Sequence, residues 1–274
     1  MGESGWSEAT VRAERTYSSA ADRFTAPQLG FWDLWGGETV ARVGLQPGAR
    51  VLDLCCGAGA SAIRAAKAVG PQGLVVGVDV SQPLLDLARA RADAEGLANL
   101  ELRCADALRT GHADGEFDAV VCVFGVFFLP DMAGFIAEMW RMVRPGGTLA
   151  VTTWGPGWLE PASSFFWDAV REVEPALHKG FNPWDEITEP TALVELFEGA
   201  GIETALAEPA AATQPLDRPE DFWVIVMGSG LRATVDALSP TQREQVHDAL
   251  LTRLGDEAVT RIRIDAVLGS ARRP

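Results

Sequence analysis

Between about residues 49 and 154, short apolar segments alternate with segments of helical periodicity, and this alternation constrains the fold more than any other feature. Apolar runs typical of strands occupy residues 50–54, 73–80, 100–104, 117–124 and 148–154. Apolar residues spaced three and four apart, as on one face of a helix, recur in residues 61–69, 81–95 and 131–143. Repeated strand–helix units of this length form a parallel sheet with helices on both faces. The pattern therefore predicts an α/β fold with a doubly wound sheet.

The segments on either side of this alternation predict how the chain is divided. Residues 1–44 have an amphipathic helical pattern and are expected to form an N-terminal helical lid over a core at residues 45–154. Residues 155–190 are expected to be an inserted lid or substrate segment. Residues 191–274 are expected to complete the sheet, with a helical insertion. Two final strands are expected at residues 202–207 and 262–270.

Composition and charge narrow the class of protein. A chain of 274 residues with 47% hydrophobic and 22% charged residues has the means to bury a globular core. The net charge of −15 argues against nucleic acid or an anionic membrane as a partner. The N-terminal sequence lacks the apolar segment of a secretory signal, and the four cysteines lack metal-binding spacing. We therefore expect a cytoplasmic protein, monomer or homodimer, that acts on a small molecule without a membrane partner.

The stretch VLDLCCGAGASA, which begins at Val51, places an acid in a buried strand and two glycines where that strand meets a helix. Gly57 and Gly59 lack side chains, so a ligand can approach the backbone and the helix N-terminus. The spacing Gly-x-Gly-x-x-Ala also fits a dinucleotide-binding turn. The thiols of Cys55 and Cys56 are expected to fill space beneath this loop rather than to react.

Acidic residues near the ends of three successive strands help to decide between two classes of ligand, a dinucleotide and a positively charged nucleoside. Asp53, Asp79 and Asp106 should converge, because ligands of such sheets bind at the carboxyl ends of the strands. Asp79 can accept hydrogen bonds from the ribose hydroxyls of either class of ligand. Asp53 would repel the pyrophosphate of a dinucleotide, and Asp106 suits the exocyclic amine of adenine. Together they predict a site for a positively charged nucleoside; a nicotinamide-dependent dehydrogenase, which rests on the glycine turn alone, is the disfavoured alternative.

Five segments in this order resemble the class I S-adenosylmethionine-dependent methyltransferases, in the broad group of the quinone-biosynthesis C-methyltransferases. They are VLDLCCGAGASA, VVGVDVS, CADA, FDAVVCVFGVFFLPD and VRPGGTLAVTTW. The resemblance covers roughly residues 47–154 and implies a Rossmann-like, mostly parallel seven-stranded sheet whose last two strands form an antiparallel pair. It also implies S-adenosyl-L-methionine as cofactor and S-adenosyl-L-homocysteine as product. The stretch Val126-Phe127-Phe128 departs from the family, which has polar residues there.

The same resemblance implies which residues contact the cofactor. Asp53 and residues 57–59 would lie by its methionine part, Asp79 by the ribose, and Asp106 with Ala107 by the adenine. Tyr17 matches a position that closes over the cofactor. The complete set is Tyr17, Asp53, Cys55, Gly57, Ala58, Gly59, Asp79, Val80, Ala105, Asp106, Ala107 and Phe124.

Aromatic and histidine side chains are the candidates for the acceptor side of the site. The chain has nine tryptophans, and aromatic residues suit either plain packing or a pocket for a flat, apolar acceptor. The substrate candidates are Trp32, Phe128, Trp154 and Trp158. His178 is the candidate general base, Tyr17 a second catalytic candidate, and His112 is expected at the opposite edge of the sheet. No acidic set has the spacing for a divalent metal, so metal independence is expected.

These features predict an S-adenosylmethionine-dependent methyltransferase with a small, largely apolar or aromatic acceptor, in specialised (secondary) metabolism. Because a sulfonium methyl group is already activated, the main task of the protein is to align the acceptor for in-line transfer. One alternative stays open: the chain keeps the cofactor as a structural element and binds or cyclises a small molecule without methylating it.

Overall fold

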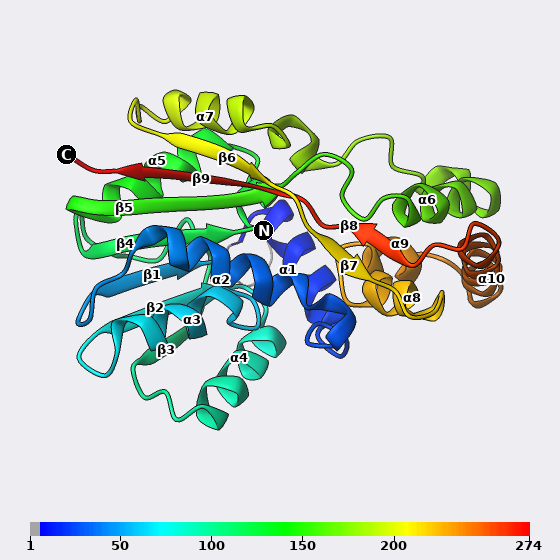
Figure 1. Cartoon of the computed structure of the whole chain (residues 1–274), viewed down its shortest axis with the longest axis horizontal. Helices are drawn as coiled ribbons and strands as arrows, with labels where there is room; N and C mark the ends of the chain where they lie inside the picture. Colours follow the sequence, from blue (N-terminus) through cyan, green and yellow to red (C-terminus); the bar gives the residue numbers. More distant parts are fainter. Residues whose placement is uncertain (1–5) are drawn as a thin grey trace.

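A twisted seven-stranded sheet forms the body of the molecule (Figure 1). The computed structural model describes residues 6–274. The strand order is β3-β2-β1-β4-β5-β9-β6, in which β9 runs antiparallel to both β5 and β6. The strands are β1 (Arg50–Leu54), β2 (Leu74–Asp79), β3 (Leu100–Cys104), β4 (Phe117–Val123), β5 (Val143–Trp154), β6 (Leu206–Ala210) and β9 (Ala266–Arg272). The predicted doubly wound, mostly parallel α/β sheet is confirmed, including its antiparallel final pair.

Helices cover both faces of the sheet. The chain moves outward from β1 to β3 and in the opposite direction from β4 to β5, so right-handed crossovers place the two sets of helices on opposite faces. On one face α2 (Phe31–Val43), α3 (Ala60–Val69) and α4 (Gln82–Ala94) pack in sequence, and on the other α5 (Met132–Met142) packs on α7 (Pro190–Gly199). Val51, Leu52 and Leu54 of β1 are completely buried, as this double cover requires.

Helix α2 belongs to the layer on the sheet, although it falls within the segment expected as a lid. Its Thr39 shares a buried hydrogen bond of 2.6 Å with Thr152 of β5, and Trp35 Nε1 donates to the carbonyl of Ile264 at 2.8 Å. Gly36 lies so close to α3 that an added Cβ would meet the backbone of Ala60 at 2.7 Å. Within residues 6–44, α1 (Glu8–Ala20) is therefore the helix that lies across the carboxyl ends of the strands.

A second, helical lobe lies to one side of the sheet, on the right in Figure 1. It consists of α6 (Ala162–Val173), α8 (Glu220–Met227), α9 (Arg232–Asp236) and α10 (Pro240–Asp256), with a ribbon of β7 (Thr213–Pro215) and β8 (Arg261–Arg263). Helix α6 packs against α10, where Arg253 pairs with Asp168 at 2.6 Å. Short 3-10 turns complete the chain: η1 (Pro27–Leu29), η2 (Val126–Phe128), η3 (Pro175–Leu177) and η4 (Pro183–Ile187).

The final strands differ from the predicted bounds. The expected strand at residues 202–207 begins later, as β6, and the expected strand at 262–270 is divided between β8 and β9. The division falls at Asp265, whose carboxylate accepts a hydrogen bond from the backbone N–H of Ala212 at 3.0 Å. This contact lies where the chain passes from the main sheet into the β7–β8 ribbon.

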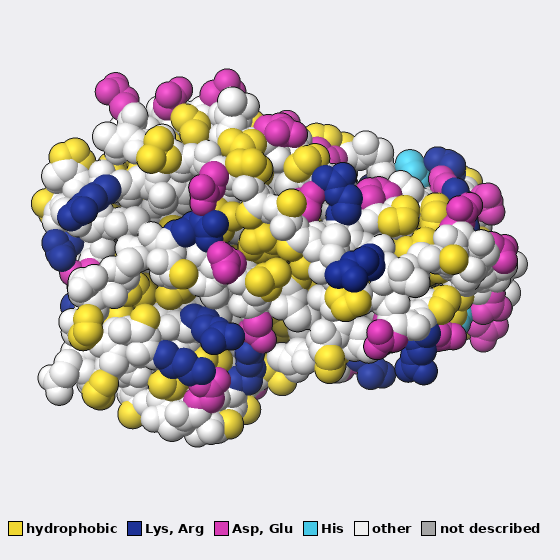
Figure 2. All heavy atoms as spheres, viewed as in Figure 1, with side chains coloured by type: hydrophobic (Ala, Val, Ile, Leu, Met, Phe, Trp, Pro, Cys, Tyr) yellow, Lys and Arg dark blue, Asp and Glu magenta, His cyan; other side chains and the backbone are white. Residues whose placement is uncertain are grey.

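The surface is mixed in charge on the face shown in Figure 2, where basic and acidic side chains alternate over both lobes. Within residues 6–274, no helix has both the length and the apolar character that crossing a membrane requires.

Candidate active site

A cavity opens at the carboxyl ends of β1, β2 and β4, beneath α1. We call it the strand-end cavity; it holds about 960 Å³ when the space at its mouth is counted. Among its walls are most of the residues predicted to bind the cofactor: Tyr17, Cys55, Gly57, Ala58, Asp79, Val80, Ala105, Asp106, Ala107 and Phe124. The predicted substrate residues Trp32 and Phe128 also line it. The topology thus gathers residues from four separate loops around one space.

Asp79, the last residue of β2, organises the entrance to this cavity. Its Oδ2 accepts from the backbone N–H of Gly57 at 2.9 Å, and its Oδ1 accepts from that of Ser81 at 2.9 Å. Burial raises the pKa of Asp79, while these backbone donors act in the opposite direction. Each carboxylate oxygen has a second lone pair, so Asp79 retains acceptor capacity toward a ligand.

Asp53 does not face the cavity, and the prediction that its charge meets the ligand directly is wrong. Its side chain is completely buried, and its Oδ2 accepts from the Ser61 hydroxyl at 2.6 Å. The reason is that Ser61, in the first turn of α3, reaches back to the strand and takes the carboxylate. Asp53 Oδ1 has no hydrogen-bond partner among the described residues. Burial raises the pKa of Asp53 to about 7.

The glycine loop bends sharply between β1 and α3. Gly57 and Gly59 have φ of 51° and 82°, and Cys55 shares this left-handed conformation at 60°. Gly59 lies beneath the loop, not on the cavity wall: an added Cβ would meet Ala88 and Ile63 at 3.1 Å. Its predicted cofactor contact is therefore replaced by a packing role against α4.

The cysteines near this loop are packed thiols. An added Cβ on Gly125 would meet Cys55 Cβ at 2.5 Å and Cys122 Sγ at 2.7 Å, so the two cysteines lie against the same glycine. A hydrogen bond with Cys122, together with burial, raises the pKa of Cys55 well above its usual value. Burial likewise raises that of Cys56. Both groups are thus held as neutral thiols, which are poor nucleophiles.

Asp106 closes the cavity on the side of β3. Only 6% of the residue is exposed, and its Oδ1 accepts from the backbone N–H of Leu108 at 3.0 Å. The backbone N–H of Ala105 donates to the carbonyl of Asp79 at 3.0 Å, which ties this loop to the end of β2. Within residues 6–274, the second carboxylate oxygen of Asp106 makes no side-chain hydrogen bond that would compete with a ligand amine.

Stacked aromatic rings form the wall beyond β4. Phe124, the residue directly after this strand, has φ of 57° and stacks on Trp154 with 3.5 Å between ring centroids. Trp154 in turn stacks on Trp158 at 4.9 Å, and Trp32 contacts both Phe124 and Trp154. Trp154 is only 2% exposed and lies behind Phe124, so its predicted place on the wall of the strand-end cavity is wrong.

Trp32 contributes an indole ring to this apolar wall. Its indole stacks on Phe24 at 5.1 Å and lines the strand-end cavity. Its Nε1–H is buried and has no acceptor among the described residues. A buried donor without a partner is costly, so a ligand oxygen that reaches it gains a hydrogen bond.

Tyr17 of α1 covers the cavity from above. Its ring makes edge contacts with Phe24 at 6.1 Å and Phe128 at 5.3 Å. Burial, and then the charge of Asp79, raise the pKa of Tyr17 above its usual value. The phenol therefore stays protonated near neutral pH and can donate a hydrogen bond but not act as a base.

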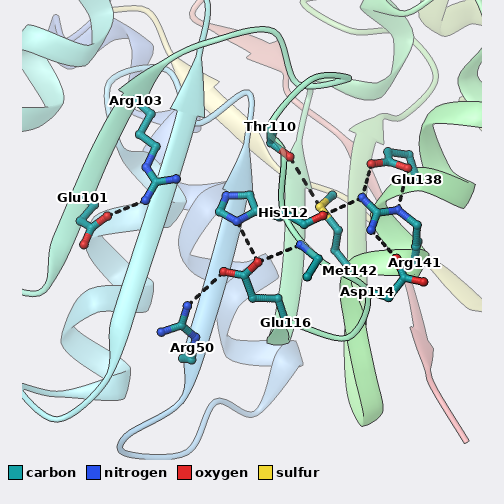
Figure 3. Close-up of polar contacts among 11 residues, drawn as sticks. Arg50, Glu101, Arg103, Thr110, His112, Asp114, Glu116, Glu138, Arg141 and Met142 are labelled. Atoms are coloured by element: carbon teal, nitrogen blue, oxygen red, sulfur yellow. Dashed lines mark hydrogen bonds and ion pairs between the residues drawn. The ribbon is translucent and has the colours of Figure 1, made fainter.

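The histidines lie away from the cavity. His178 packs edge-on against Trp167 at 6.0 Å and lines neither the strand-end cavity nor the second cavity described below, so its predicted place over the site is wrong. The reason is that residues 175–177 turn as η3 before His178 is reached. His112 lies at the amino edge, as expected, in a polar network with Glu116 and Arg50 (Figure 3).

Several wall residues were not predicted. Thr10, Ala13 and Phe24 come from α1 and the turn after it, and Leu84 comes from α4. The spacing of Thr10, Ala13 and Tyr17, three and four residues apart, is the signal that could have placed them on one helical face. Among the described residues, no group of three or more His, Cys, Asp or Glu side chains is arranged to hold a metal ion.

Comparison with known proteins identifies the family. Residues 51–147 match the family described as a methyltransferase domain. A demethylmenaquinone methyltransferase of Listeria welshimeri is 31% identical over 179 residues, which are 61% of this chain and 76% of that relative. The chain belongs to the class I S-adenosylmethionine-dependent methyltransferases. The predicted family, the enzyme class and the cofactor are thereby confirmed.

Solved structures share the fold of this methyltransferase. An S-adenosylmethionine-dependent methyltransferase of Aquifex aeolicus has a TM-score of 0.52 and 23% identity, and covers 68% of this chain and 88% of its own. The cyclase SpnF has a TM-score of 0.52 and 21% identity, and covers 88% and 81%. At these identities the likeness concerns the fold alone.

The strand-end cavity of the methyltransferase fits S-adenosylmethionine. It lies at the carboxyl ends of the strands, where ligands of such sheets bind. Asp79 and Asp106, the charged residues among its described walls, are both acids, which suits a ligand with an ammonium and a sulfonium group. Gly57 lines the cavity with no side chain of its own, so a ligand can approach the loop backbone there.

Proposed function

We propose that this methyltransferase methylates a small, largely apolar or aromatic acceptor that carries an oxygen beside the reacting atom. The observation that carries the proposal is Trp32: a flat aromatic surface on the cavity wall with an indole N–H that lacks an acceptor. Phe124 and Phe128 extend this surface. A phenol or quinol ring would lie among these rings while its oxygen accepts from Trp32 Nε1.

The cofactor would lie along the other side of the same cavity. Asp79 would accept from the ribose hydroxyls, and Asp106 with Ala107 would hold the adenine. Asp53 lies behind the loop and would not contact the cofactor directly. It would act through its hydrogen bond with Ser61 and through its own Oδ1, which lacks a hydrogen-bond partner among the described residues. When bound, S-adenosylmethionine supplies an activated methyl group. Residues 45–154 would thus form the cofactor-binding part of the chain.

The acceptor would need little help from a base. The described walls of the strand-end cavity contain no His, Lys or Arg, and Tyr17 stays protonated. Such a site suits a nucleophile that is acidic in its own right, such as a phenol or an enolisable carbon. The protein would then contribute alignment and the exclusion of water, and good alignment can supply about 7–11 kcal/mol. Tyr17, Phe24 and the rest of α1 would provide that cover.

The name of the curated relatives suggests a first acceptor to test. Those proteins are demethylmenaquinone methyltransferases, and quinols have the flat ring and the oxygen that the wall around Trp32 would accept. In this chain Phe127 packs on Trp184 at 5.4 Å and Phe128 on Tyr17, so this side of the cavity is apolar. We therefore place the natural acceptor among small aromatic hydroxyl compounds, in specialised metabolism, with carbon or oxygen as the methylated atom.

The test is transfer of a labelled methyl group. Purified protein with labelled S-adenosylmethionine is incubated with demethylmenaquinol and a panel of naphthols and phenols, and products are read by mass spectrometry. Labelled product with an equal amount of S-adenosylhomocysteine supports the proposal. If an acceptor is converted without label, and equally well with S-adenosylhomocysteine, the chain is a non-methylating enzyme on this fold. Transfer only to aliphatic amines would contradict the aromatic acceptor.

A further inference from the structure

A second cavity lies in the helical lobe, between the segment after β5 and the turn before α9. We call it the tryptophan cavity, because Trp158, Trp167 and Trp184 line it; it holds about 580 Å³ with its mouth included. It shares no wall residue with the strand-end cavity. The buried Trp154 separates the two, since its ring contacts Phe124 on one side and Trp158 on the other.

The indole rings of the tryptophan cavity form a corner. Trp158 and Trp184 meet edge to face, with centroids 5.1 Å apart and planes at 78°. Trp167 of α6 supplies a third indole. Two aromatic faces at a right angle, with a third nearby, can surround a rounded cationic group, and tryptophan gives the strongest attraction of this kind.

Carboxylates provide the only charges on the described walls of this cavity. They are Glu160 and Asp185, and the remaining polar walls include Ser163, Asn182 and Thr188. Glu160 Oε1 accepts from the hydroxyls of Ser163 at 2.7 Å and Ser164 at 2.8 Å, and these bonds hold the carboxylate in place. Among residues 6–274 it forms no ion pair. Its negative charge is therefore available to a ligand.

Two cations lie near the cavity without lining it. Arg263 pairs with Asp265 at 2.5 Å, so its charge is already matched. Lys179 lies 6.0 Å from the centre of the Trp167 ring, and burial with the charge of Arg12 lowers its pKa. Trp158 Nε1–H is buried without an acceptor among the described residues, so a ligand oxygen would satisfy it.

The geometry points to a second ligand site in this methyltransferase: the tryptophan cavity binds an organic ammonium group with a neighbouring hydroxyl or ether oxygen. The ammonium lies in the corner of Trp158 and Trp184, and Glu160 balances its charge. An anionic ligand is excluded by the two carboxylates. This site does not depend on which acceptor the strand-end cavity takes, because the two cavities have separate walls.

The test compares choline with dimethylbutanol, its uncharged carbon analogue, by isothermal titration calorimetry. Choline is expected to bind at one site and dimethylbutanol at least about tenfold more weakly, because the indole faces attract a cation and not an uncharged group of the same shape. Glu160→Gln should weaken choline binding about tenfold. Glu186→Gln, an equal loss of charge at an exposed residue outside the cavity, should leave it unchanged. Equal binding of the two compounds would overturn the proposal.

A second pair of variants keeps the result independent of folding. Trp184→Leu should abolish choline binding and Trp184→Phe should restore part of it, with the unfolding temperature of each recorded. Asp79→Asn, in the strand-end cavity, should have no effect on choline. If Asp79→Asn removed choline binding, or if saturating S-adenosylmethionine competed with it, choline would be in the strand-end cavity and the assignment would be wrong. Methyl transfer is not read in this experiment, so the two proposals fail separately.

Discussion

The ring of Phe124 lies flat on the indole of Trp154, with 3.5 Å between their centroids and 13° between their planes. Phe124 also adopts a left-handed backbone conformation, which costs a residue with a side chain about 1–2 kcal/mol. The stacked pair therefore holds a strained strand end beside the cavity, and the two effects can be separated by mutation.

Phe124→Ala removes the ring and keeps the strain, whereas Phe124→Gly removes both. We expect the Ala variant to lose about 3–5 kcal/mol of unfolding free energy, as buried Phe→Ala changes do. The Gly variant should be about 1 kcal/mol more stable than the Ala variant. Urea unfolding of the three proteins measures both differences. If the Gly variant were the less stable of the two, the backbone at this position would carry no strain.

Asp53 makes the stability of the unliganded protein fall as the pH rises. Its pKa of about 7 in the folded chain exceeds its unfolded value of 3.8, so its stabilising contribution is complete below pH 4 and is lost between about pH 4 and 7. Each pKa unit of difference corresponds to about 1.4 kcal/mol. Asp79, whose pKa burial also raises, adds to the same trend.

Asp53→Asn should therefore reduce the slope of stability against pH and make the unliganded protein more stable than the wild type at pH 8. The amide keeps the acceptor for Ser61 and removes the buried charge. Urea unfolding at pH 5, 6.5 and 8 gives the comparison. The groups whose pKa is lowered, such as Asp118 and Asp221, titrate at lower pH, so they do not contribute to the change in stability between pH 5 and 8. An unchanged slope would mean that Asp53 is ionised throughout.

Asp79→Asn should weaken S-adenosylmethionine binding about 10–100-fold, because hydrogen bonds to charged groups contribute about 1.5–3 kcal/mol. The increase in unfolding temperature on adding the cofactor should shrink accordingly. Asp86→Asn is the matched control, since Asp86 is exposed on α4 and lies outside the cavity. Equal affinities of the Asp79 and Asp86 variants would remove Asp79 from the cofactor site.

Trp32→Phe keeps an aromatic ring in the wall and removes the indole N–H. We expect the KM for the acceptor to rise about 5–10-fold, the effect of one lost hydrogen bond, while the affinity for S-adenosylmethionine stays the same. Steady-state kinetics and calorimetry give the two values. Trp223→Phe, on α8 against His247, is the control. A similar loss of cofactor affinity would show that Trp32 serves the cofactor instead.

Tyr17→Phe should lower kcat by less than about threefold, because a phenol whose pKa is raised does not accept a proton. A general base would give a loss of about 10²–10⁴-fold. Tyr17→Ala, which also removes the contacts with Phe24 and Phe128, should weaken binding of both ligands. Rates from pH 6 to 9 provide the check: a rising limb that disappears in Tyr17→Phe would restore Tyr17 as a catalytic base.

The fold could be predicted from sequence because each parallel strand is marked by local sequence features that do not depend on the rest of the chain. An apolar run such as that of β2 ends at an acid, and a helix with a clear N-cap, here Ser81, follows it. The last strand was predicted as a single element because residues 262–270 contain mainly strand-forming residues on both sides of Asp265. The separation of β8 from β9 depends on Asp265 binding a distant backbone N–H, which the sequence does not show.

The sequence could indicate which residues line the strand-end cavity where backbone position decides, and could not where a side chain has a choice of partners. Asp79 and Asp106 follow from their places at strand ends. Asp53 occupies an equivalent place, but Ser61 takes its carboxylate, and no spacing rule shows which neighbour wins. Trp154 and Trp158 are four residues apart and belong to different surroundings, one buried between the cavities and one on the wall of the second.

Adjacent residues of α1 are hydrogen-bonded to different parts of the molecule. Ser18 contacts Ser81, next to Asp79, at 3.0 Å, and Ser19 donates to Asp236 of α9 at 3.2 Å. Arg232 of α9 also reaches Asp22, just beyond α1, at 3.2 Å. A shift of α9 relative to the sheet cannot preserve both sets of bonds. This helix therefore links the helical lobe to the ribose end of the strand-end cavity through side-chain hydrogen bonds.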